Sequence, residues 1–216
     1  MPTPFRIRVF VDELGRYGSP LLVIMNSASL SDAECQSIAR ESGTSETVYV
    51  DDTKDGSLRI FVPAGRIPFA GYPLIGAGWL LRNLGYPLDT LNTDAGSVPI
   101  EVTEDACAIS TAPGRGLPWK LIPTASIVEL MRLSAAGENR HDYAWAWADE
   151  ATGHVRARAF TSASGALEDE ATGSAAIELC AVLGRELTIA QGSGSLIHVE
   201  PTGSVVRLSG RVIRER

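Results

Sequence analysis

Two short loops, each running directly into an almost wholly apolar stretch, constrain the fold of this 216-residue chain more than any other feature. Residues 68–73 (PFAGYP) precede the apolar stretch 74–84, and residues 168–174 (EDEATGS) precede the apolar stretch 175–183. A helix that is apolar on nearly every side must be enclosed by protein. Each stretch is therefore predicted to form a helix inside a curled sheet.

The segments that flank these loops recur with a shift of about a hundred residues, as expected for an internal repeat. Residues 58–61 (LRIF) correspond to residues 156–160 (RARAF), and each segment is preceded by alternating residues and a turn that predict a hairpin. The order helix, hairpin, loop, apolar helix, strands thus occurs twice. It predicts a duplicated, pseudo-symmetric α+β protein.

We expect two domains, divided within the Pro- and Gly-rich stretch 111–118. Residues 1–112 would form the N-terminal domain and residues 113–216 the C-terminal domain, and each half is long enough to bury a core. Each domain is expected to be a mixed, mostly antiparallel sheet curled into a barrel around its central apolar helix. The last strand could return to the N-terminal domain.

Composition excludes several classes of function. A formal net charge of −7 without a basic stripe argues against nucleic acid as a partner. No apolar stretch approaches membrane-spanning length and the N-terminus lacks a signal-peptide pattern, so we expect a cytoplasmic protein without a membrane partner. No metal site is expected, because metal-ligand spacing is absent among the cysteines and histidines, which are Cys35, Cys107, Cys180, His141, His154 and His198. The motifs of nucleotide and dinucleotide binding are also missing. Each histidine is predicted to be an ordinary strand or turn residue.

The start of each apolar helix is a candidate anion site. A helix N-terminus presents unpaired N–H groups and about half a positive charge, and glycine at the two entrances, Gly71 and Gly173, allows close approach to the backbone. Thr172 or Ser174 would suit a helix cap, and a glycine follows each helix, as suits its C-terminal end. The alternative is that both are merely well-capped core helices.

A further set of motifs lies in one order along the chain: residues 10–12 (FVD), 18–20 (GSP), 45–50 (SETVYV), 59–63 (RIFVP), 68–73 (PFAGYP), 168–175 (EDEATGSA) and 191–192 (QG). In this order and context they resemble the PhzF-like, or phenazine biosynthesis-like, proteins. The resemblance spans almost the whole chain. It implies the diaminopimelate epimerase-like fold, in which two similar domains each wrap a sheet around a central helix and the site lies in the cleft between them.

The resemblance also implies a cofactor-free isomerase, in which a carboxylate removes a proton from one carbon of a small carboxylate substrate and a proton is returned at another carbon. Glu46 matches the catalytic glutamate, expected to act first as base and then as acid, and Asp169 matches the second acidic residue, expected to hydrogen-bond the substrate or assist proton return. Gly173 and Ser174 match positions that would hold the substrate's carboxylate, and Gly71 belongs to the opposing helix entrance. A desolvated carboxyl has a raised pKa, which suits it to such acid–base work.

Without the resemblance, these carboxylates have simpler explanations: Glu46 as a solvated side chain at a strand start, and Asp169 as a local helix-entry charge. The main departure from the family pattern is Tyr72, where the family commonly has histidine. Tyrosine exchanges protons near neutrality far less readily than imidazole, so the standard proton relay is in doubt, although Tyr72 stays in the catalytic set. The alternative is a catalytically silent member that binds a small anionic ligand or serves as an assembly partner.

The family also bears on pathway and assembly. The resemblance implies secondary metabolism, such as phenazine-like or other antibiotic biosynthesis, and a homodimer. Related racemases place paired cysteines at the two helix entrances, and this chain has none there, which disfavours thiol-pair racemisation. Glu178, inside an otherwise apolar helix, is expected to be structural or partly exposed, because an ionised carboxylate there needs a partner.

Overall fold

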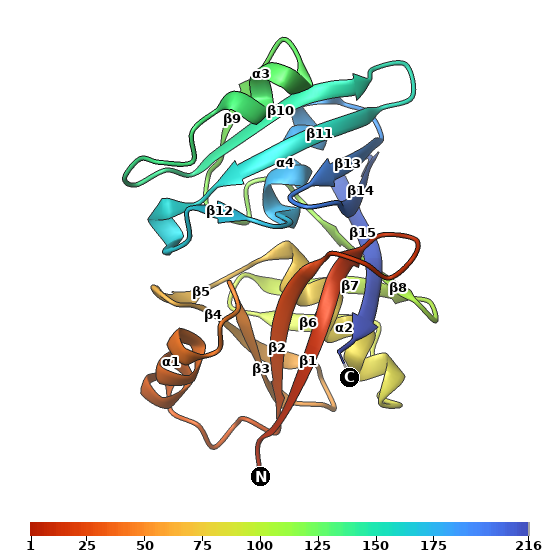
Figure 1. Ribbon diagram of the computed structural model, residues 1–216. Helices are drawn as coiled ribbons and strands as arrows, with labels where there is room; N and C mark the ends of the chain where they lie inside the picture. Colours follow the sequence, from red (N-terminus) through yellow and green to blue (C-terminus); the bar gives the residue numbers. More distant parts are fainter. Residues whose placement is uncertain (216) are drawn as a thin grey trace.

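The computed structural model of the protein describes residues 1–215, which form two lobes (Figure 1). The first lobe contains β1 (Thr3–Val11), β2 (Ser19–Met25), α1 (Asp32–Glu41), β3 (Thr47–Asp52), β4 (Ser57–Val62), β5 (Gly65–Ile67), α2 (Gly71–Asn83), β6 (Thr90–Thr93), β7 (Gly96–Val102) and β8 (Ala106–Thr111). The second contains β9 (Lys120–Pro123), α3 (Ile127–Arg132), β10 (Asp142–Asp149), β11 (His154–Phe160), the short 3-10 helix η1 (Ser162–Ser164), β12 (Glu168–Asp169), α4 (Gly173–Leu183), β13 (Leu187–Gln191) and β14 (Ser195–Thr202). The last strand, β15 (Val205–Arg214), runs along both lobes.

The strands of the first lobe close into a barrel around α2. Their hydrogen-bonded order runs β1, β2, β3, β4, β6, β7, β8, and β15 closes the ring by pairing with both β8 and β1. α2 lies inside this ring, with Leu74, Ile75 and Leu81 fully buried. The predicted α+β class, with a mixed sheet curled around an apolar helix, is confirmed.

The second lobe wraps its sheet around α4 but leaves the sheet open. From β15 the order continues through β14, β13, β11 and β10 to β9, where the path ends within the described part of the chain. The segment that precedes β9, residues 112–119, forms turns and bends instead of a closing strand. Its two prolines, Pro113 and Pro118, lack the N–H group that a sheet ladder requires. This segment therefore stays a loop at the mouth of the lobe.

The internal repeat predicted from the sequence is visible in the strand pairing. β2 pairs parallel with β3 and β4 parallel with β6, just as β9 pairs parallel with β10 and β11 parallel with β13. The repeat extends to a side chain: Arg59 of β4 donates to the carbonyl oxygens of Ser27 and Leu30 before α1, and Arg158 of β11 donates to those of Leu130 and Leu133 at α3. In both lobes an arginine thus ties the outer helix to the sheet.

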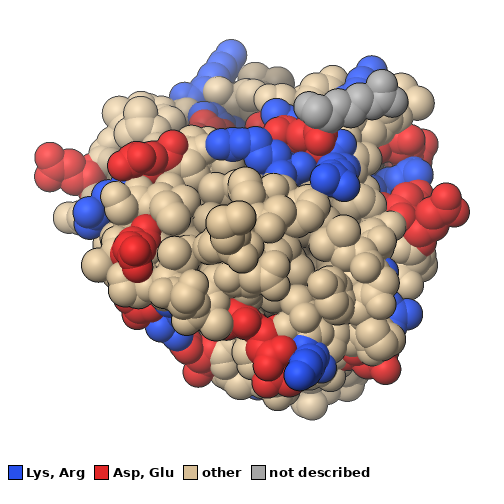
Figure 2. Space-filling view, turned by 90° about the horizontal axis from the view of Figure 1, so that it is seen from below, with Lys and Arg blue, Asp and Glu red and all other residues tan. Residues whose placement is uncertain are grey.

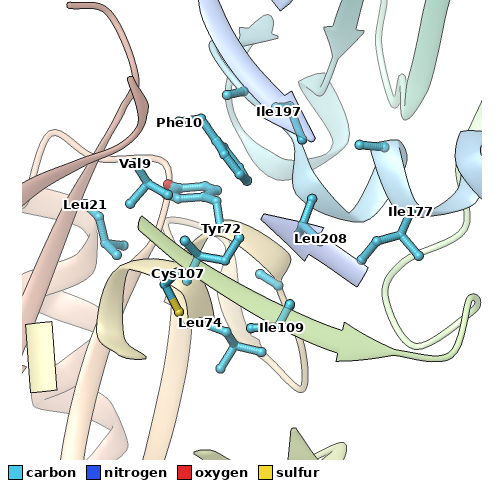
Figure 3. Packing of buried hydrophobic residues seen from close by; sticks show 14 of the residues in the cluster. Val9, Phe10, Leu21, Tyr72, Leu74, Cys107, Ile109, Ile177, Ile197 and Leu208 are labelled. Atoms are coloured by element: carbon cyan, nitrogen blue, oxygen red, sulfur yellow. The ribbon is translucent and has the colours of Figure 1, made fainter. Parts of the chain in front are cut away.

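The two helix entrances meet where the lobes join. A Cβ atom added at Gly71 would lie 2.7 Å from Cδ2 of Leu208 and 3.3 Å from Cα of Gly173, and one added at Gly173 would also lie 2.7 Å from the same Leu208 atom. Figure 3 shows Leu208 of β15 between Tyr72 and Leu74 of α2 and Ile177 of α4. Only glycine permits this approach of α2 to α4, and one apolar core therefore continues from lobe to lobe.

The lobe division proposed at residues 112/113 stays a prediction, and Arg216 lies outside the described residues. The last strand, β15, does return to the N-terminal lobe, because its Val212 pairs with Val9 of β1. Leu208, earlier in β15, pairs with Val199 of β14 in the second lobe. Neither lobe is complete without β15.

The surface of the first lobe carries charge of both signs. Seen from the end where the termini lie, acidic and basic side chains sit around an uncharged centre (Figure 2). Within residues 1–215, no helix combines the length and apolarity needed to cross a membrane.

Candidate functional site

A cavity of about 300 Å³ lies between the lobes and is lined from both of them. The first lobe contributes residues 43–46, the end of β4 and the entrance to α2. The second contributes the loop before β9, the segment from η1 to β12 and the entrance to α4. Polar and charged side chains of both lobes meet here: Ser45, Glu46, Trp119, His141, Asp169, Thr172 and Ser174.

Glu46 and Tyr72 form a hydrogen-bonded pair on the first-lobe side of the cavity. Glu46 directly precedes β3, and Tyr72 is the second residue of α2. Tyr72 is only 2% exposed, and its hydroxyl donates to Oε2 of Glu46. Within residues 1–215, Oε1 of Glu46 has no hydrogen-bond partner. The buried first turn of α2 thus orients the carboxylate and leaves one of its oxygens available.

Asp169 is held on the opposite side by hydroxyl groups. Its side chain is buried, and its Oδ2 accepts from Thr172 Oγ1 at 2.7 Å, while Oδ1 accepts from Ser45 Oγ at 3.3 Å. Ser45 is the neighbour of Glu46, so this second bond crosses between the lobes. Gln191 Nε2 donates to the backbone oxygen of Asp169 at 3.0 Å and to Thr172 Oγ1 at 2.9 Å. The carboxyl of Asp169 is therefore fixed in place from two directions.

Burial raises the pKa of both carboxyls. For Glu46 the loss of hydration is the larger cause and the charge of Asp169 adds to it, while the hydrogen bond from Tyr72 acts in the opposite direction. For Asp169 desolvation again raises the pKa most, against the hydroxyl donors Thr172 and Ser45. Burial and the two carboxylates also raise the pKa of Tyr72 well above its ordinary value. The phenol therefore acts as a hydrogen-bond donor at neutral pH, and the carboxyls are suited to accept and release protons.

The sequence-predicted anion-binding residues are only partly brought to the cavity. Ser174 lines it, whereas Gly71 and Gly173 are buried behind it against each other. The expectation that Thr172 or Ser174 caps α4 is confirmed in position only: Thr172 is the N-cap residue, but it makes no side-chain cap hydrogen bond. Both hydroxyls are engaged elsewhere, since Thr172 donates to Asp169 and Ser174 Oγ accepts from the Trp119 indole N–H at 3.0 Å.

Two aromatic residues of the cavity were not predicted. Trp119 ends the Pro- and Gly-rich loop, and His141 directly precedes β10. Their rings stack with centroids 3.6 Å apart and an angle of 25° between planes. His141, expected to be an ordinary strand or turn histidine, lines the cavity instead. A tryptophan in a loop otherwise rich in proline and glycine is the only sequence signal that pointed here.

Glu178 has a structural contact. Its Oε1 accepts from the backbone N–H of Gly114 at 2.5 Å, so the carboxylate in the apolar helix α4 holds the loop that joins the lobes. It is half-buried and does not line the cavity. The expectation of a structural or partly exposed role is confirmed. Across residues 1–215, no cluster of three or more His, Cys, Asp or Glu side chains is arranged to hold a metal ion.

The hydroxyl donors of Asp169 yield a first prediction. We expect Thr172→Val, which keeps the side-chain shape but removes the hydroxyl, to raise the pKa of Asp169 by about 1–2 units, because a hydrogen bond to a charged group contributes roughly 1.5–3 kcal/mol. Carbon-detected NMR titration of the Asp169 carboxyl measures the shift. Thr161→Val is the matched control, since Thr161 also lines the cavity but donates to the Ala166 carbonyl. Equal titration of Asp169 in both variants would contradict the assignment.

Comparison with known proteins points to one family. Residues 7–136 match the family model whose description is "phenazine biosynthesis-like protein". A trans-2,3-dihydro-3-hydroxyanthranilate isomerase of Pseudomonas fluorescens is 30% identical over 208 residues, covering 78% of this chain and 75% of that protein.

Solved structures agree with the fold. A phenazine biosynthesis protein of the PhzF family from Bacillus anthracis superposes with a TM-score of 0.81 at 19% identity, over 99% of this chain and 96% of that one. A hydroxyproline epimerase from Agrobacterium vitis superposes with a TM-score of 0.68 at 10% identity, over 100% of this chain and 91% of that one. The two-lobed architecture is therefore shared with epimerases.

Proposed function

The chain belongs to the phenazine biosynthesis-like family of isomerases, and from this premise we propose that it moves a proton and a double bond within a small carboxylate-bearing metabolite. The observation that carries the proposal is the pair of carboxyls, Glu46 and Asp169, which approach one cavity from opposite lobes with raised pKa values. Such pairs of perturbed groups in a cleft are typical of acid–base sites.

Glu46 is the base in this proposal. Its free oxygen, Oε1, takes the proton from a substrate carbon, while the hydrogen bond from Tyr72 keeps the other oxygen in place. Asp169 hydrogen-bonds the substrate or assists the return of a proton. Ser174 and the N–H groups in the first turn of α4 hold the substrate's carboxylate, because a helix N-terminus favours negative charge. No bound cofactor enters this sequence of steps.

The proposed substrate class is a small, partly unsaturated ring carboxylate. The relative from Pseudomonas fluorescens is named for trans-2,3-dihydro-3-hydroxyanthranilate, a compound of this kind, and the cavity of about 300 Å³ is at the lower end of the range found for small-molecule sites. We extend the proposal to a role in natural-product biosynthesis, in the cytoplasm, by a homodimer.

Hydrogen exchange tests the proposal. The protein is incubated with trans-2,3-dihydro-3-hydroxyanthranilate, and with a panel of related unsaturated carboxylates, in deuterated water, and proton NMR follows each carbon-bound hydrogen. We expect deuterium in at least one substrate or its isomerised product. A carboxylate that raises the melting temperature without exchange or isomerisation would instead support the silent, ligand-binding alternative, for which the non-titrating Tyr72 is the favouring observation.

The pH dependence follows from the sign of the pKa shift. Glu46 must be ionised to accept a proton, and desolvation together with the charge of Asp169 raises its pKa. We therefore expect kcat/KM to rise with pH along a limb whose pH range lies above the pKa of an ordinary glutamate. We expect the apparent pKa of this limb to exceed the value of about 4.3 for free glutamate by at least about 1 unit. A pH–rate profile that is flat from pH 5 upward would contradict a raised pKa on the base. Because Glu46 and Asp169 interact, the apparent pKa of this limb describes the pair of carboxyls and not Glu46 alone.

A further inference from the structure

His141 is a chemically distinct group in the cavity. Among the described residues that line it, His141 carries the only imidazole. Imidazole is a side-chain group that can both accept and donate a proton, one at each ring nitrogen. Tyr72 does not release its proton at neutral pH, because its pKa is raised well above an already high value. The cavity therefore contains a proton-transfer group that the roles assigned to Glu46 and Asp169 leave unused.

The imidazole ring is oriented by its neighbours. Nδ1 of His141 lies 2.7 Å from the carbonyl oxygen of Pro118. Because a carbonyl oxygen only accepts, Nδ1 carries the hydrogen of this bond. The ring also stacks on Trp119, whose indole N–H donates to Ser174 Oγ at 3.0 Å. The histidine is thus held relative to the first turn of α4, where the substrate's carboxylate is proposed to bind.

The second ring nitrogen is available. Within residues 1–215, Nε2 of His141 has no hydrogen-bond partner. Asp169 differs in this respect, since one of its carboxylate oxygens accepts from Thr172 and the other from Ser45. Both oxygens of Asp169 are thus engaged by hydroxyl donors, which suits this side chain to binding, whereas Nε2 of His141 is free to exchange a proton with a ligand.

We propose that His141 is a catalytic residue that returns the proton through Nε2, an inference that rests on the proposed isomerase function. Glu46 takes one proton from a substrate carbon, and the electron pair of the broken C–H bond shifts the double bond. The imidazolium of His141 delivers one proton from Nε2 to the other carbon. The substrate gains and loses one proton, and solvent then moves a proton from the Glu46 carboxylic acid to the neutral imidazole.

Substitution at position 141 separates this role from a structural one. His141→Asn places an amide donor where Nδ1 lies, so it can retain the bond to Pro118 while it removes Nε2. His154→Gln is the matched control, because His154 is exposed on β11 and does not line the cavity. We expect His141→Asn to lower kcat for isomerisation of trans-2,3-dihydro-3-hydroxyanthranilate by about 100-fold, with the control unchanged. Free imidazole should restore part of the rate to His141→Ala.

Deuterium exchange distinguishes failure of this inference from failure of the proposed function. In His141→Asn, Glu46 still removes its proton, so the substrate should take up deuterium at that carbon while isomerisation is slow. If His141→Asn isomerises at the wild-type rate, the inference about His141 is wrong and the isomerase function stands. If the wild-type protein neither exchanges nor isomerises any carboxylate of the panel, the proposed function is wrong.

A binding measurement tests His141 without turnover. Benzoate, a simple ring carboxylate, is titrated into the protein while NMR follows the ring resonances of its three histidines. We expect the resonances of His141 to shift and those of His154 and His198, both exposed outside the cavity, to stay in place. Benzoate that binds without moving the His141 resonances, or that shifts all three equally, overturns contact between Nε2 and the ligand.

Discussion

Replacing Glu46 by glutamine is expected to lower isomerisation by about 1000-fold and to abolish deuterium exchange into the substrate. Glutamine retains an oxygen that can accept from the Tyr72 hydroxyl, so the geometry of the pair is preserved. It cannot accept a proton from carbon. Steady-state kinetics and NMR exchange in deuterated water measure the two effects, and full exchange in Glu46→Gln would remove Glu46 from the base role.

The same variant should not be unfolded. The pKa of Glu46 is raised in the folded protein, so its ionised form is less favourable there than in the unfolded chain. The resulting cost is absent at low pH, where the group is protonated in both states, and grows as pH rises above its ordinary pKa. Glu46→Gln removes this cost, so its free energy of unfolding at neutral or higher pH should equal or exceed that of the wild type. Glu41→Gln, at the exposed end of α1, is the control and should change neither the isomerisation rate nor the free energy of unfolding.

Replacing Gly71 by valine is expected to have the largest effect on stability. Even a Cβ at this position would lie 2.7 Å from Cδ2 of Leu208 and 3.2 Å from the backbone carbon of Gly173. The branches of valine increase the overlap, and overpacking of this kind costs about 1–3 kcal/mol. In a chain of this size each kcal/mol lowers the Tm by roughly 2–4 °C. Because Tyr72 is the next residue, displacement of α2 should also reduce activity through Glu46.

The matched control is Gly65→Val. A Cβ at Gly65 would have no atom within 4 Å, and the residue lies in β5, where valine is well tolerated. Thermal unfolding and kinetics of the two variants separate the contact between α2 and α4 from a general effect of replacing glycine. Equal Tm values for the two valine variants would show that the lobes can accommodate a side chain at their junction.

Much of the fold could be predicted because its signals are local. The apolar stretches after residues 73 and 174 predict buried helices, and the recurrence of LRIF within RARAF predicts equivalent strands, in which the structure places Arg59 and Arg158 at equivalent positions. The open edge at β9 could not be predicted by symmetry. It depends on whether residues 112–119 pair with a distant strand, which is a property of tertiary packing.

The site was predictable where motifs carried it. Glu46 and Asp169 were identified by resemblance, and the structure brings both to one cavity. The bond from Ser45 to Asp169 joins residues from different lobes and has no local signature. The stack of Trp119 on His141 likewise forms only when the loop before β9 folds over the start of β10, so the sequence offered no signal beyond a tryptophan in a Pro- and Gly-rich loop.

The pairing of β1 with β15 joins segments near opposite ends of the chain. During synthesis the first barrel cannot close until β15 has left the ribosome, although all its other strands are made before the second lobe begins. In that interval β1 and β8 each retain an unpaired edge, which is a template for pairing with other chains. The first barrel can therefore close only after the second lobe has been translated. A stalled nascent chain would need chaperones to protect it against aggregation.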